Sequence, residues 1–517
     1  MALTPPTVTA SQPRGLRSAL GRRPALALFI AIFLVYVAFL DLGSGNLGYR
    51  YLDQTLALVH DGTWAIDRYN NTADVAIVQG HRYPSVPPGM AVLGVPSYAL
   101  SQMLWGLVPP LERVRLSTFI HDYLVQDGRF EADNSFVQSV DLADFFVGAL
   151  VVTIFLNAAA GALLAVLVYR TLQLVGLEED RARWLTILFA FGTFAFFYST
   201  TLNAHIPSTL AAFAAFYLLL QGTAGRTWWA ALVSGACAAA AMALDYPLGV
   251  TLAATTVYFV WRVRSWRLRA AYGFGAGLVL VGMAAYSWVI FGSVIGMPFT
   301  HVSAPLAANH ARGLFGVGTP SLHVVLELLV LPRRGLLVYA PLIILSCLGG
   351  VVAWRQRRHR PEVLFIAGLV LGMLLFNAGY TAWHGDWAFG PRHLVVVLPF
   401  LTILAGLGRW PARWLLWTVG SLGILVNWLG AQFRTVGPEF VNPLGSVYGP
   451  AFLSQGPTFP LVANIAKSLD FASGSLPLFS GLVLLGLVLL VGDLVGLPQK
   501  PTTRTRNSTA ALAQPKG

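Results

Sequence analysis

The stretch GYRYLDQTLALVHDGTWAIDRYNNTADVAIVQGHRYPSVPPGMAVLGVP, residues 48–96, follows the first apolar run of the chain. It holds nine acidic, basic or histidine side chains, while the segments around it are nearly free of charge. Ionisable residues at membrane level are costly and tend to mark function. We therefore expect chemistry in this stretch and membrane helices on either side of it.

The composition of the 517-residue chain is that of an integral membrane protein, with 56% hydrophobic and 11% charged residues. Ordinary globular domains have roughly 25% charged residues. A membrane helix needs ~20 mainly apolar residues, so the predicted fold class is all-α: a polytopic transmembrane helical protein with about 12–13 membrane segments and juxtamembrane helices in the first external loop. The two cysteines, Cys237 and Cys347, lie inside apolar runs at no metal-ligand spacing, which indicates packing. The predicted membrane helices cover residues 24–42, 88–108, 145–168, 184–199, 205–222, 227–244, 247–261, 270–292, 337–354, 362–380, 394–408, 412–431 and 476–497.

Short arginine-rich loops predict the orientation of these helices. Arginines gather at 262–269, 355–360 and 409–413, and basic residues recur in the C-terminal tail, as the positive-inside rule expects of cytoplasmic segments. The same clusters account for the net charge of +12, so we expect no nucleic-acid partner. The predicted organisation is a cytoplasmic N-terminal tail (1–23), a transmembrane domain (24–497) with a first external loop (43–87), and a disordered cytoplasmic tail (498–517).

Two cytoplasmic termini require an even number of crossings. The segment 88–108 is the doubtful crossing, because it is interrupted by Pro96 and follows Pro87. It is interpreted as a re-entrant or juxtamembrane element, unless 109–142 hides a weak crossing. With this orientation, the remaining polar clusters fall on the extracytoplasmic face and predict a site there.

The first external loop combines a predicted helix with several carboxylates. Leu52, Leu56 and Val59 recur at helical spacing, which predicts an amphipathic helix over 49–61 at the membrane interface. A carboxylate near a bound acceptor can act as general base toward a hydroxyl that attacks a sugar carbon. The alternative is that these carboxylates only solvate a surface loop.

The order of motifs resembles the GT-C superfamily of integral membrane glycosyltransferases, which includes the aminoarabinose and protein O-mannosyl transferases. The first loop contributes Arg50-Tyr51, Gly80-His81-Arg82-Tyr83 and Pro87-Pro88-Gly89. The similarity continues with Asp245-Tyr246-Pro247, Pro332-Arg333-Arg334-Gly335-Leu336, Tyr339-Ala340-Pro341, Trp383-His384-Gly385-Asp386 and Gly390-Pro391-Arg392-His393. The resemblance implies an enzyme that takes a sugar from a polyprenyl-phosphate carrier, with inversion at the sugar carbon.

Two positions depart from the superfamily pattern. Its members usually carry an acidic residue shortly before the Arg-Tyr pair, whereas 45–48 holds none here, and many have a lysine where this chain has Val86. The candidate bases, in order of preference, are Asp41, Asp74, Asp67 and Asp53. Phosphate binding would then fall to arginines, whose planar charged fork suits a phosphate. The predicted binding residues for the substrate and the lipid phosphate are Arg50, Arg82, Tyr83, His205, Asp245, Arg333, Arg334, Trp383, His384, Asp386, Arg392 and His393.

These residues predict a multi-pass glycosyltransferase of the plasma membrane, with an extracytoplasmic site. Its expected partners are a polyprenyl-phosphate sugar donor, membrane lipid and an acceptor that the sequence does not identify. No cofactor is assigned: the ligand types of His384, Asp386 and His393 fit a divalent metal such as zinc, but their spacing matches no recognised metal site, so a metal is the less favoured alternative. The alternatives are a carrier-lipid transporter or flippase, an O-antigen polymerase or ligase type of protein, and a superfamily member that binds the carrier without catalysis.

Overall fold

The structure, a computed structural model, describes residues 23–460 except 42–45, 70–71, 73, 127–140, 223–225, 303–306, 308–309, 311–312, 314–315, 409–412, 434 and 458. The predicted helix at 476–497 and nearly all of both predicted tails lie outside the described residues.

Every predicted membrane helix up to residue 431 has a helical counterpart within a few residues, and the all-α fold class is confirmed. An apolar run in lipid must pair its own backbone groups, so hydrophobic length predicts helices well. The helices of the first half are α2 (Pro24–Ala38), α4 (Gly89–Leu107), α7 (Leu142–Thr153), α8 (Ala160–Leu174), α9 (Glu179–Gly192), α10 (Ala195–Ser199), α11 (His205–Leu220) and α12 (Trp228–Leu244). Those of the second half are α13 (Gly249–Arg262), α14 (Trp266–Phe291), α16 (Leu322–Leu329), α17 (Leu336–Tyr339), α18 (Leu342–Arg355), α19 (Arg360–Gly379), α20 (Val397–Gly406), α21 (Arg413–Gln432) and α22 (Gly449–Gln455).

Some predicted spans are broken. The run 184–199 divides into α9 and α10 at Thr193, and the run 337–354 divides into α17 and α18 at Pro341, a residue that cannot continue a hydrogen-bonded helix. By contrast, α7 and α8 are joined by a π-helical turn, Ile154–Ala159, into one helix of 33 residues. Four described helices are long and apolar enough to cross a membrane alone, and the α4–α5 pair adds a fifth if it counts as one span. Shorter apolar helices of 10–17 residues accompany them: α2, α11, α12, α18 and α20.

The first external loop contains the predicted helix and a small hairpin. Helix α3 (Asn46–Leu56) continues into a π-helical turn, Ala57–Asp61, and matches the helix expected over 49–61. Strands β1 (Val75–Val78) and β2 (His81–Pro84) then pair antiparallel, with Val78 opposite His81. Both turn residues have positive φ, 52° at Gln79 and 86° at Gly80, as a tight two-residue hairpin turn requires.

Helix α4 ends in a sharp bend. The chain turns by 112° between α4 and the start of α5 (Pro110–Gln126). Pro109 and Pro110 lie at the bend, and proline lacks the N–H that a continuing helix would use. Helix α5 then packs on α7. A bend of this size fits a broken membrane span as well as a re-entrant element, so the interpretation of 88–108 as a re-entrant or juxtamembrane element stays a prediction.

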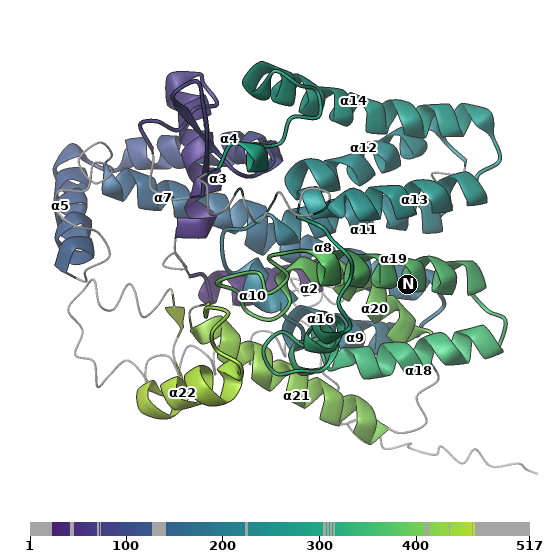
Figure 1. Cartoon of the computed structure of the whole chain (residues 1–517). Helices are drawn as coiled ribbons and strands as arrows, with labels where there is room; N and C mark the ends of the chain where they lie inside the picture. The colour runs from purple at the N-terminus through teal and green to yellow at the C-terminus, as the bar shows by residue number, and fades with distance from the viewer. Residues whose placement is uncertain are drawn as a thin grey trace, which may run out of the picture.

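The bundle has two distinct ends (Figure 1). Helices α11, α12, α13, α14, α18 and α19 lie with their axes roughly aligned, and α3 runs across one end of them and packs on α4. The arginine-rich connections α13–α14 and α18–α19 lie at the opposite end. The polar first loop and the arginine loops are thus separated by the length of the bundle, as the predicted orientation requires.

Candidate active site

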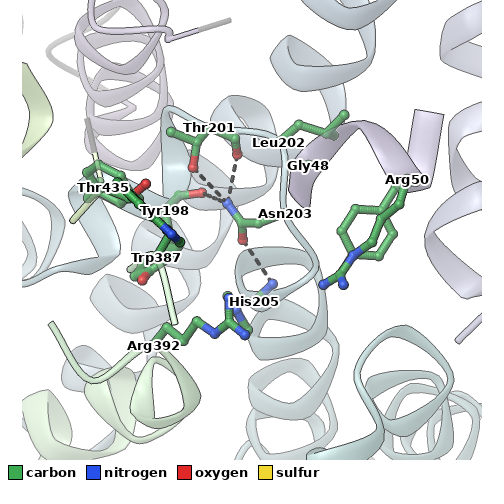
Figure 2. A pocket seen from close by; sticks show the side chains of 12 residues that line it. Gly48, Arg50, Tyr198, Thr201, Leu202, Asn203, His205, Trp387, Arg392 and Thr435 are labelled. Carbon is green, nitrogen blue, oxygen red and sulfur yellow. Dashed lines mark hydrogen bonds between the residues drawn. The ribbon is translucent and has the colours of Figure 1, made fainter. Parts of the chain in front are cut away.

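A cleft lies where four separate parts of the chain meet at the α3 end of the bundle (Figure 2). Its lining comes from α3, from α10 with the segment that leads into α11, from the loop after α19 and from the segment after α21. The lining residues are Gly48, Arg50, Tyr51, Phe197, Tyr198, Thr201, Leu202, Asn203, His205, Trp387, Arg392 and Thr435. Three of the predicted site residues, Arg50, His205 and Arg392, are therefore on one cleft.

Arg50 enters the cleft from α3 and pairs with a predicted base. Its guanidinium forms a salt bridge with Asp74, which also accepts a hydrogen bond from the Ser85 hydroxyl. The Arg50 side chain is only 13% exposed. Asp74 therefore serves as the counter-ion of Arg50, and it is outside the cleft lining.

His205 begins α11 and is bound to Asp245. The Nδ1 atom of His205 lies 2.9 Å from Oδ2 of Asp245, the residue directly after α12. The backbone N–H of His205 donates to Oδ1 of Asn203, which fixes the start of α11. Among the described residues, Nε2 of His205 has no hydrogen-bond partner, so one ring nitrogen is held and the other is not, in a residue that lines the cleft.

Arg392 approaches from the opposite side. No carboxylate lies within 4 Å of its guanidinium in the described part of the chain, and its Nε is buried without a hydrogen-bond partner there. The side chain crosses Gly385, where an added Cβ would lie 2.9 Å from Cγ of Arg392. In Figure 2 the guanidinium ends of Arg50 and Arg392 lie on either side of His205.

Arg334 is a backbone clamp at the rim of this site. Its side chain is fully buried, and its guanidinium donates to the carbonyl oxygens of His384 (2.7 Å), Asp386 (2.9 Å), Val436 (3.2 Å) and Arg333 (3.2 Å). These bonds hold the turn at 384–386, in which Gly385 and Asp386 have φ of 72° and 48°. Because the turn carries Gly385 under Arg392, Arg334 acts on the cleft through the loop, whereas the sequence predicted a direct anion contact.

Two histidines near Arg392 are held neutral. Burial lowers the pKa of His384, and the neighbouring arginines add to this effect, although Asp386 opposes it. Burial likewise lowers the pKa of His393 well below its usual value, with Arg392 and His205 acting in the same direction. Their rings therefore add hydrogen-bonding groups to the region without adding positive charge.

The other predicted site residues lie away from the cleft lining. Asp67 accepts from His81 Nδ1 (2.7 Å) and from the backbone N–H of Arg82 (2.8 Å), so it orders the hairpin. Asp53 is buried. Asp41 lies beside the segment after α10, where its backbone N–H donates to the Thr200 carbonyl. Arg333 lies 4.0 Å from Glu327. Arg82 is exposed on β2, next to Tyr83, and Trp383 packs against the ring of His384.

An apolar groove of about 610 Å³ runs beside the first external loop. It is formed by the first turns of α4, the last turns of α12 and one face of α14, with Trp64 and Tyr286 in contact at one end. The Tyr286 hydroxyl accepts a hydrogen bond from Gln54 of α3. Leu244 lines the groove and is followed directly by Asp245, so the groove and the His205–Asp245 pair are adjacent.

Within the part of the chain that the structure describes, no three His, Cys, Asp or Glu side chains come together as a metal site. His384 Nδ1 and Asp386 Oδ1 are 3.4 Å apart. The backbone N–H of Asp386 donates to Nδ1 of His384, so the lone pair of that nitrogen is already engaged in a hydrogen bond.

Three solved structures are similar to this chain along most of its length. The first is ArnT from Cupriavidus metallidurans bound to undecaprenyl phosphate, with 15% identity and a TM-score of 0.48 over 91% of this chain and 77% of that chain. The second is the same protein in the apo state, with 17% identity and a TM-score of 0.48 over 93% of this chain and 78% of that chain. The third is the apo oligosaccharyltransferase of Archaeoglobus fulgidus, with 12% identity and a TM-score of 0.40 over 80% of this chain and 56% of that chain. No protein-family model matches the sequence, and no curated protein matches it.

Several lining residues were not among the predicted site residues. Trp387 is 56% exposed and lines the cleft, whereas the sequence favoured its neighbour Trp383. Tyr198 lies inside an apolar run and gives no polar signal, although its hydroxyl donates to the Phe389 carbonyl and its ring packs on His205. The spacing of the loop 383–393 identified the region, but the direction of each side chain depends on the turn that Arg334 holds.

Proposed function

We propose that this protein is a membrane glycosyltransferase that moves a sugar from a polyprenyl-phosphate carrier to an acceptor on the extracytoplasmic face. One observation carries the proposal: Arg392, a cation without a carboxylate within 4 Å among the described residues, faces Arg50 across a cleft beside an apolar groove. Two guanidinium groups offer forked donors to a phosphate. An apolar groove next to them suits a lipid chain.

The environment of the cleft fits the departure of a phosphate. As the bond between the sugar and the carrier phosphate breaks, negative charge develops on the phosphate oxygens. Donors that are already oriented toward that position stabilise the transition state without reorganisation. Arg50 is held by Asp74, and Arg392 is held over Gly385, so both are oriented before a substrate binds.

Trp387 is the proposed contact for the sugar. The residue is 56% exposed and lines the cleft together with Arg392. An exposed indole of this kind presents an apolar face that can stack on a sugar ring. The acceptor would enter from the outer face, and transfer would proceed with inversion at the sugar carbon.

The proposal is tested with purified protein, radiolabelled undecaprenyl phosphate and a panel of polyprenyl-phosphate sugars. Both the lipid affinity and the release of labelled sugar from the lipid phase are measured. We expect Arg392→Gln to weaken lipid binding by at least about tenfold, since a charged hydrogen bond contributes ~1.5–3 kcal/mol, and Arg50→Gln to weaken it by a similar factor. Arg68→Gln is the control, because Arg68 is an exposed arginine of the same loop that is outside the cleft lining and is not a predicted binding residue.

An unchanged affinity in Arg392→Gln would contradict the assignment of the phosphate site. Binding that depends on Arg392 without any release of sugar would favour a carrier-binding or transport function.

A further inference from the structure

The cleft contains one group suited to accept a proton. Of the four carboxylates that the sequence predicts as bases, none lines the cleft. Asp74 is paired with Arg50 and Ser85, and Asp67 with His81 and Arg82. His205 is the titratable residue of the lining that is neither an arginine nor a tyrosine.

We propose that His205 is the general base of the transfer reaction and that Asp245 is its positioning residue; this inference rests on the function proposed above. Nδ1 of His205 is 2.9 Å from Oδ2 of Asp245, and both side chains are nearly buried, at 13% and 15% exposed. A carboxylate at Nδ1 favours the tautomer with the proton on that atom, which leaves the Nε2 lone pair for the cleft. The carboxylate also stabilises the imidazolium that forms when Nε2 takes a proton.

The surroundings of His205 are compatible with this role. The Tyr198 ring of α10 lies 5.3 Å from the imidazole, centre to centre, and the His393 ring of the Arg392–Leu394 turn lies 6.0 Å from it. Arg392, Arg50 and Tyr51 line the same cleft. Asp245 is thus the negative charge in direct contact with the ring, and the arginines lie where a departing phosphate needs them.

The reaction balances with these groups. The acceptor hydroxyl gives its proton to Nε2 of His205 as its oxygen bonds to the anomeric carbon of the sugar. The bond between that carbon and the carrier phosphate oxygen breaks, and its electron pair leaves with the phosphate, whose charge faces Arg50 and Arg392. Polyprenyl phosphate and the glycosylated acceptor are released, and the imidazolium returns its proton to water.

The test compares release of labelled sugar from polyprenyl-phosphate sugars, with methyl glycosides and water as acceptors, in His205→Gln, Asp245→Asn and Asp245→Glu. His205→Gln should lower the rate about 10²–10⁴-fold, the usual contribution of a general base, with lipid affinity changed less than twofold. His81→Gln is the matched control, because His81 also holds a carboxylate at Nδ1 but is exposed on the hairpin. Asp245→Glu should recover part of the activity that Asp245→Asn loses.

Rescue by the conservative variant separates positioning from a merely structural effect. Asp245→Asn should lower kcat while Tm and lipid affinity stay near the wild-type values, because the carboxylate acts on the reaction only through the tautomer and orientation of His205. A His205→Gln variant that keeps a third or more of the wild-type rate, or an Asp245→Glu variant no faster than Asp245→Asn, overturns the assignment while leaving the proposed function in place. Failure of the wild type to release sugar from any donor overturns both.

Discussion

At the scale of single residues, Arg334 was predicted to bind the substrate, whereas in the structure it holds backbone segments together. Its guanidinium meets four backbone carbonyls in a fully buried position. Unpaired buried acceptors cost about 1–3 kcal/mol each. We expect Arg334→Met to lower the free energy of unfolding by about 3 kcal/mol or more, seen as a large drop in Tm in detergent, whereas Arg82→Met changes it by about 0.5 kcal/mol or less. Equal Tm values for the two variants would rule out the clamp.

A second prediction at this scale concerns His393 and pH. Burial lowers its pKa in the folded protein, so the unfolded chain binds the proton more readily. The contribution of His393 to the free energy of unfolding is fully present above the unfolded pKa of about 6.5. It declines below that pH, by at most about 1.4 kcal/mol per pH unit for one proton. His393→Gln removes this term, so its Tm should fall less than that of the wild type between pH 8 and pH 5. Parallel Tm curves for the two proteins would contradict the prediction.

At the scale of elements, glycines determine how closely α12 and α14 approach. The GFGAG run at 273–277 resembles a phosphate-binding loop, but it lies inside an apolar run and has no preceding strand. The sequence therefore predicts close helix packing there. An added Cβ at Gly275 would lie 2.0 Å from the Leu232 carbonyl, so packing is confirmed at this position. An added Cβ at Gly273 or Gly277 would meet nothing within 4 Å, and the sequence did not distinguish these glycines from Gly275. Which glycine faces the partner depends on helix rotation, which an all-apolar helix does not encode.

The groove beside α14 provides a sharp test of the lipid-chain site. Gly282 lines the groove, and an added Cβ there would meet nothing within 4 Å. We expect Gly282→Phe to fill the groove and weaken binding of undecaprenyl phosphate at least about tenfold, while binding of a short-chain prenyl phosphate changes little, since affinity for the chain follows its buried apolar area. Gly277→Phe, an open position of α14 outside the groove lining, is the matched control. Equal weakening in both variants would point to a general disturbance of α14.

At the scale of the whole molecule, the helices could be predicted from sequence and the pairings could not. Runs of ~20 apolar residues must form helices in lipid, which accounts for the agreement from α2 to α21. The partners of Asp74 and Arg334 depend on segments distant in sequence, and no local pattern marks them. The sequence therefore predicted which regions form the candidate site, and the structure brings Arg50, His205, Asp245 and Arg392 of those regions together. The roles of the carboxylates could be assigned only from the structure.

The orientation of the molecule is also open to test. In a variant without Cys237 and Cys347, Gln79→Cys places a thiol on the hairpin turn at the site end, and Gln356→Cys places one in the α18–α19 connection at the other end. We expect a membrane-impermeant maleimide to label residue 79 in intact cells and residue 356 only after permeabilisation, because arginine-rich loops remain in the cytoplasm. The reverse pattern would place the cleft on the cytoplasmic face.

The most direct measurement follows donor and products together in liposomes that contain the purified protein. Polyprenyl phosphate and transferred sugar are quantified during turnover of a doubly labelled polyprenyl-phosphate sugar. We predict that one polyprenyl phosphate appears for each sugar transferred, with inverted configuration, and that Arg392→Gln abolishes both signals. Intact donor that binds in an Arg392-dependent manner, or crosses the membrane with its sugar still attached, would contradict the account.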